Sequence, residues 1–154
     1  MIKIDTIENI TDEEYINIVK DILENNNFKK LLDIEHHGIT RYDHLIRVSY
    51  SSYKIAKKLK FKYVDVARGG LLHDFFLDGN ERTNSKKITD TFTHPKRALK
   101  TAKSNFQIND IQANIIVSHM FPFYLSIPKY KESILVNIMD KVIGGYEMIK
   151  YKFR

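Results

Sequence analysis

The segment YVDVARGGLLHDFF, residues 63–76, has apolar side chains at helical spacing and carries a histidine–aspartate pair near its end. Its apolar positions, which include Val64 and Leu71, predict a helix with one buried face. Gly69 and Gly70 lie inside this pattern, although each glycine costs a helix about 1 kcal/mol relative to alanine. We expect the glycine pair to allow a close approach by a neighbouring helix, so the segment predicts a bundle of packed helices.

The same periodicity recurs on both sides of this segment. It predicts further helices at about residues 11–24, 28–35, 40–59, 95–106, 109–120 and 131–149. Residues 77–93 are polar and contain Asp78-Gly79, which indicates a surface loop and puts Pro95 in the first turn of the next helix. Because no segment shows a convincing strand pattern, we predict an all-α fold. It is a single domain, residues 1–154, with a bundle of six or seven helices.

The composition is that of an ordinary globular chain. It has 154 residues, of which 43% are apolar and 29% charged, with six histidines and no cysteine. The lack of cysteine excludes disulfides, thiolate metal sites and cysteine nucleophiles. No apolar run approaches the roughly 18 residues that a membrane-spanning helix needs, and the acidic start MIKIDTIENITDEEY lacks the pattern of a signal peptide. We therefore expect a cytoplasmic protein with no membrane partner.

The net charge of +6 is a weak guide to partners. Lysine supplies most of the excess, with 19 lysines against six arginines, in a chain that is also rich in isoleucine and asparagine, as an AT-rich genome would encode. The densest lysine cluster, residues 54–62, is interpreted as the solvated end of a helix. The charge therefore does not favour a nucleic-acid partner, and a positive field would equally attract a small phosphorylated molecule.

Four histidines and two aspartates lie on or beside predicted helices, among apolar neighbours: His44, His73, Asp74, His94, His119 and Asp140. Taken alone, most have an ordinary structural interpretation, such as a helix cap or a buried hydrogen bond. Asp140 is the exception, because an acid inside the apolar run ILVNIMDKVI is costly to bury unless it is paired or bound to a cation. Together the six indicate a metal site in the bundle core. Imidazole and carboxylate without thiolate favour iron, manganese, zinc or nickel.

At these residues the chain resembles the HD superfamily of metal-dependent phosphohydrolases. The similarity covers about residues 40–145 and is carried by RYDHLIRVSYSSYKIAKKL, ARGGLLHDF, THPKRALKTA, IIVSHM and LVNIMDKV. The adjacent His73-Asp74, after a helix of small residues and leucines, is fairly specific, and the spaced histidine upstream and aspartate downstream strengthen it. His94 and His119 match the subset of the superfamily that holds two metals. The remaining histidines, at positions 36 and 37, match no ligand position.

The resemblance implies a role for each of the six residues. The first of two divalent transition metal ions would be held by His44, His73, Asp74 and Asp140. The second would be held by His94 and His119, with Asp74 bridging the two ions through its carboxylate oxygens. Asp74 is also the residue to which catalysis is assigned. Because neighbouring side chains on a regular helix point about 100° apart, we expect the histidine–aspartate pair to lie where the helix ends or distorts.

The activity that the resemblance implies is hydrolysis of a phosphate ester. A metal-activated water would attack phosphorus while the cations neutralise the phosphoryl oxygens. This chemistry is that of a phosphomonoesterase or phosphodiesterase acting on a small phosphorylated substrate, such as a nucleotide. Arg41, Lys96 and Lys141 lie near ligand positions and are candidates for contacting phosphate. A surface salt bridge is an equal alternative for each.

Two other functions stay open from the sequence. Some HD-fold proteins with a similar layout hold two irons and act as oxygenases, and histidine with carboxylate serves both chemistries. A non-enzymatic, metal-stabilised binder of nucleotides or nucleic acid would use the basic surface instead.

The chain differs from the motifs of the HD superfamily in two places. It lacks the Gly-Lys that often follows the His-Asp pair. It lacks a Gly-Tyr-Pro signature too, so it does not match the cyclic-di-GMP-degrading branch.

Overall fold

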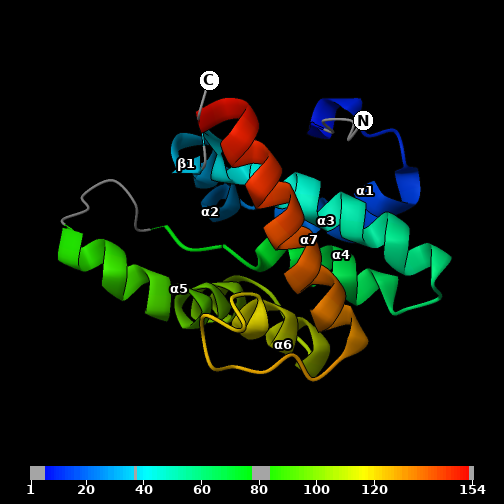
Figure 1. Cartoon of the computed structure of the whole chain (residues 1–154). Coiled ribbons are helices and arrows are strands. Elements are labelled where there is room, and N and C mark those ends of the chain that lie inside the picture. Colours follow the sequence, from blue (N-terminus) through cyan, green and yellow to red (C-terminus); the bar gives the residue numbers. More distant parts are fainter. Residues whose placement is uncertain (1–5, 37, 78–83, 153–154) are drawn as a thin grey trace.

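The helices of the protein form one bundle, as the all-α prediction required (Figure 1). The computed structural model describes residues 6–36, 38–77 and 84–152. Within them the seven α-helices are α1 (Glu13–Leu23), α2 (Asn26–Lys29), α3 (Arg41–Lys58), α4 (Tyr63–Leu72), α5 (Asn84–Asn105), α6 (Asp110–Ser118) and α7 (Lys131–Glu147). The shorter elements are η1 (Ile7–Asn9), η2 (Lys30–Asp33), β1 (Glu35–His36), β2 (Ile39–Thr40) and η3 (Met148–Lys152), a π-helical turn that extends α7.

The packing places α4 at the centre of the bundle. It contacts α3, α6 and α7, while α7 lies across α3 and α6 and α5 packs on α6 (Figure 1). A small apolar cluster joins α3, α4, α6 and α7 through Val48, Val66, Ile115 and Val136. No helix among the described residues is both long and apolar enough to cross a membrane.

The prediction of a loop at residues 77–93 is wrong from residue 84 onward. The helix α5 begins at Asn84, so Pro95 lies inside the helix and not in its first turn. Residues 84–94 contain no glycine or proline. Pro95 lacks the N–H that would donate to the Thr91 carbonyl and its ring crowds that carbonyl, so α5 contains this proline at a cost of roughly 3 kcal/mol. The Asp78-Gly79 pair lies outside the described residues.

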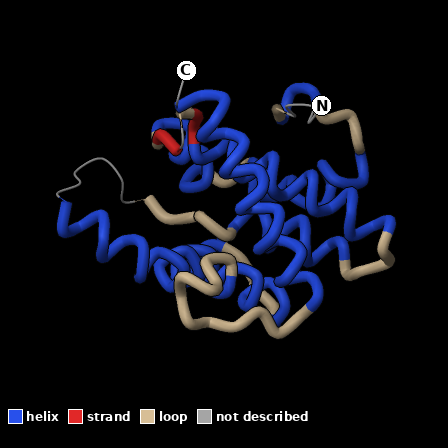
Figure 2. Tube along the Cα trace, in the orientation of Figure 1, coloured by secondary structure: helices blue, strands red, loops and turns tan. Residues whose placement is uncertain are grey.

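The segment before α3 also differs from the prediction. In place of one helix at residues 28–35, α2 is followed by the single 3-10 turn η2 and by a two-stranded antiparallel hairpin of β1 and β2 (Figure 2). The hairpin contains His36, and His37 lies outside the described residues. It leads directly into α3, whose N-cap is Thr40: the Thr40 hydroxyl accepts a hydrogen bond from the Asp43 backbone N–H at 3.1 Å.

The glycine pair of α4 lies where neighbouring helices approach most closely, as the sequence predicted. A Cβ at Gly69 would lie 2.8 Å from Cδ1 of Ile115 on α6. A Cβ at Gly70 would lie 3.2 Å from Cα of Ser49 on α3. The bare backbone of α4 therefore lets this helix fit between α3 and α6.

Gly69→Ala is expected to lower the free energy of unfolding by about 1 kcal/mol. Overpacking against Ile115 costs about 1–3 kcal/mol, and the better helix propensity of alanine returns only about 1 kcal/mol. The matched control is Gly145→Ala on α7, where nothing lies within 4 Å of the new Cβ. It should raise stability by roughly 0.5–1 kcal/mol. Urea denaturation measures both changes, and an equal gain in the two variants would contradict the close contact.

Candidate metal centre

The helices α4 and α6 end in histidines that are held in the same way. His73 and His119 are the C-cap residues of the two helices. The Nδ1 atom of His73 donates to the Gly70 carbonyl at 2.6 Å, and Nδ1 of His119 donates to the Ile116 carbonyl at 2.7 Å. Each bond satisfies a carbonyl of the last helical turn and leaves a lone pair on Nε2 of the neutral ring. The expectation that the histidine–aspartate pair marks a helix end is therefore confirmed.

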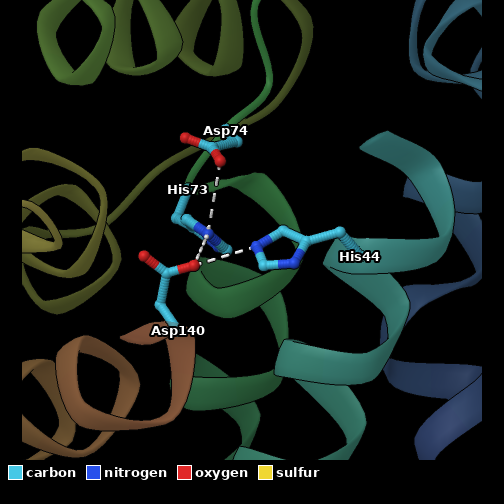
Figure 3. A group of neighbouring side chains, drawn as sticks. All are labelled: His44, His73, Asp74 and Asp140. Carbon is cyan, nitrogen blue, oxygen red and sulfur yellow. Dashed lines mark hydrogen bonds and ion pairs between the residues drawn. The ribbon is translucent and has the colours of Figure 1, made fainter. Parts of the chain in front are cut away.

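The first group of side chains gathers His44 of α3, His73, Asp74 and Asp140 of α7 (Figure 3). One carboxylate oxygen of Asp140, Oδ1, lies 2.9 Å from Nε2 of His44 and 3.1 Å from Nε2 of His73. The Oδ2 atom of Asp74 lies 3.7 Å from the same His73 nitrogen. Two imidazoles and two carboxylates from three regions of the chain thus point toward one another.

The second group joins Asp74 to His94 of α5 and to His119. The Oδ1 atom of Asp74 lies 3.4 Å from Nε2 of His94 and 3.1 Å from Nε2 of His119, and these two nitrogens are 3.0 Å apart. In each group the candidate ligand atoms lie within 4.8 Å of one another. All six predicted residues therefore come together, and Asp74 turns one oxygen toward each group.

The two aspartates of the centre are anionic. Burial raises the pKa of Asp74 and of Asp140, but the neighbouring imidazoles outweigh burial and hold both pKa values well below their usual range. Burial lowers the pKa of His44, yet its hydrogen bonds to Asp140 and Glu147 raise that pKa to about 10. Burial lowers the pKa of His119, which favours its neutral ring. Without an ion, the centre thus holds two negative charges, a protonated His44 beside Asp140 and a neutral His119 that offers a nitrogen lone pair.

This set of donors fits a divalent cation. Asp74 is only 5% exposed, and its buried Oδ1 accepts no hydrogen bond, although two imidazole nitrogens lie beside it. An anionic oxygen buried without a donor is costly, and a neutral His119 presents a lone pair to it and not a proton. A cation bound between these atoms would remove the conflict. Imidazole and carboxylate together suit iron, manganese, zinc or nickel.

Glu147 supports this centre from behind His44 and was missed in the sequence. It is fully buried, and its Oε2 accepts from Nδ1 of His44 at 2.7 Å while Oε1 accepts from Nη1 of Arg47 at 3.3 Å. The proton on Nδ1 leaves Nε2 of His44 to face Asp140. A carboxylate behind a metal-binding imidazole orients the ring and raises its basicity. The available signal was spacing, since Glu147 follows Asp140 by two helical turns on the same face of α7.

The three basic residues predicted near phosphate lie in different surroundings. The Nζ atom of Lys141 donates to the His119 backbone carbonyl at 3.0 Å, and burial lowers its pKa. Arg41 is 2% exposed, donates to the Phe76 carbonyl at 2.5 Å and stacks on the Phe76 ring at 3.8 Å. Lys96 is exposed on α5, where it lines a surface hollow. Lys141 is therefore in direct contact with a residue of the centre, and a phosphate contact stays a prediction for all three.

A helical bundle that delivers imidazoles and carboxylates from several helices to one buried point defines a class of helical metal-site proteins. The family model described as HD domain matches residues 41–144, which is more than half of the chain. The protein belongs to the HD domain family. The matched range agrees with the motif-bearing core expected at about residues 40–145, and this family generally comprises metal-dependent hydrolases that bind divalent ions. Searches of curated proteins and of solved structures gave no match.

Glu147→Ala is expected to lower the free energy of unfolding of the metal-free protein by about 3–5 kcal/mol, because it removes one partner of a buried ion pair and leaves His44 and Arg47 without their acceptor. Glu147→Gln retains an acceptor oxygen and should lose less. Urea denaturation in the presence of a chelator measures both variants. Wild-type stability in Glu147→Ala would contradict the supporting role.

Proposed function

We propose that the protein is a two-metal phosphohydrolase that acts on a small phosphorylated molecule, such as a nucleotide. The observation that carries the proposal is the position of Asp74, whose two carboxylate oxygens face two different groups of imidazoles. A carboxylate in this position can bind two ions at once, with further ligands on either side. Membership of the HD domain family supports the reaction class.

In this proposal the two ions, divalent iron, manganese, zinc or nickel, share the six residues of the centre. The first would be held by His44, His73, Asp74 and Asp140, and the second by Asp74, His94 and His119. When bound, such ions act as Lewis acids that lower the pKa of water and neutralise charge on phosphoryl oxygens. The chain's part is to fix its nitrogen and oxygen donors before the substrate arrives.

The solvent-facing side of the centre suggests how a substrate enters. The side chains of His94 and Asp140 are 12% and 14% exposed, whereas those of His44 and His73 are fully buried. A phosphate would therefore approach between α5 and α7. Lys141 lies on that side, next to Asp140 in the chain, and its positive charge would attract the phosphoryl group.

Asp74→Asn tests the proposal directly, because it keeps the shape of the bridging side chain and removes its charge. Metal affinity and kcat should both fall by more than the roughly 10- to 100-fold that the loss of an outer-shell partner costs. His119→Ala should lower the metal content from two equivalents to one. Lys103→Ala, on the exposed surface of α5, is the control that should retain both ions and the activity.

The measurements are metal analysis of protein purified without chelator, and hydrolysis of a panel of p-nitrophenyl phosphate, its bis-ester and nucleotides. Release of p-nitrophenol reports on the two nitrophenyl esters, and release of inorganic phosphate reports on the nucleotides. The proposal fails if neither iron, manganese, zinc nor nickel supports hydrolysis of any of these esters. Oxygen consumption by the iron-loaded protein without hydrolysis would identify an oxygenase instead.

A further inference from the structure

Asn137 of α7 holds the end of α6 in place. Its side-chain Nδ2 lies 3.1, 2.9 and 2.8 Å from the backbone carbonyl oxygens of Ser118, His119 and Phe121. The last carbonyls of a helix have no donor within the helix, so this amide satisfies the C-terminal end of α6. The Nζ atom of Lys141, one turn further along α7, donates to the same His119 carbonyl at 3.0 Å.

The contact links two parts of the centre through one helix. Asp140 lies three residues after Asn137, so a single turn of α7 presents a carboxylate to the first group and binds the backbone that carries His119. The His119 ring is itself tied to its own helix by the bond from Nδ1 to the Ile116 carbonyl. Ring and helix end therefore move together, and the position of Nε2 depends on how that helix end is held.

We propose that Asn137 is a positioning residue for the second group of the centre. It holds His119 where Nε2 can share an ion with Asp74 and His94. The inference rests on the proposed two-metal function. It divides the supporting residues between the two groups, with Glu147 behind His44 in the first and Asn137 behind His119 in the second.

Asn114 provides a matched control. It is a buried asparagine of α6, 8% exposed, whereas Asn137 is partly buried, and it also ties α6 to the segment that leads into α7. Its Nδ2 donates to the Ile127 carbonyl at 3.2 Å, and its Oδ1 accepts from the Lys129 N–H at 2.9 Å and from the Ser133 hydroxyl at 2.6 Å. Among the described contacts of Asn114, none reaches a residue of the centre. Its loss should therefore affect stability without affecting metal binding.

The experiment is a calorimetric titration of the metal-free, full-length protein with Mn²⁺, together with metal analysis after dialysis. In Asn137→Ala the affinity for the second ion should fall by about 10- to 100-fold, the usual cost of losing an outer-shell partner, while the first ion keeps its affinity. Asn137→Ser retains one donor and should lose less, and it serves as the test variant if Asn137→Ala does not fold. In Asn114→Ala both affinities should equal those of the wild type.

Two results would overturn the inference. One is wild-type affinity for both ions in Asn137→Ala. The other is a loss of affinity for both ions that is the same in Asn137→Ala as in Asn114→Ala. In either case a wild-type protein that binds two ions and hydrolyses phosphate esters leaves the proposed function intact. A wild-type protein that binds two ions and loses the second in Asn137→Ala, yet hydrolyses no ester, supports the positioning role and contradicts the proposed function. A wild type that binds only one ion overturns both.

Discussion

Two carboxylates buried at the middle of a helical bundle set the main constraint on this structure. Asp74 and Asp140 are both held in their anionic form, and charges removed from water destabilise a fold unless opposite charge or hydrogen bonds surround them. The partners come from α3, from the ends of α4 and α6, and from α5. These helices must therefore converge within a few ångströms, and the packing of the bundle is the means by which they do so.

Close packing and ligand placement are joined at a single residue, Gly70. Its lack of a side chain lets α4 approach the backbone of Ser49 on α3, and its carbonyl accepts the hydrogen bond that orients His73. The helix then ends at this histidine, which frees the next residue from helical geometry. Asp74 can therefore turn toward the same point as His73, although neighbours on a regular helix point about 100° apart. The end of α4 at His73 thus lets the next residue, Asp74, face both groups of imidazoles.

Sequence patterns were sufficient for the parts of the fold that depend on local interactions. Apolar periodicity predicted the main helices, and the glycine pair predicted a close helix contact. The four histidines and two aspartates on or beside apolar helices indicated one centre, and the resemblance to the HD superfamily implied how they divide between two ions. Glu147 and Asn137 were missed because their roles depend on tertiary packing: Glu147 meets His44 across 103 residues of chain. The first half of α5 was missed because its polar composition resembles a loop and because Pro95 favours the start of a helix, whereas α5 continues through this proline despite its cost.

The orientation of α7 depends on the centre as well as on hydrophobic burial, since Val136 and Ile143 of this helix are buried too. Its inner face carries Asn137, Asp140 and Glu147, while Ile134, Ile138 and Val142 remain 49%, 52% and 50% exposed. Leaving such side chains half exposed forgoes roughly 1 kcal/mol each, about half of what full burial contributes. Turning the helix to bury them would withdraw Asp140 from the two imidazoles. It would also expose Val136 and Ile143, so polar contacts and apolar burial together hold α7 in this orientation. An ion that binds only the folded chain would add to this balance, since ligand binding to the native state stabilises it. An ion bound at Asp140 would therefore favour the folded state in which α7 has this orientation.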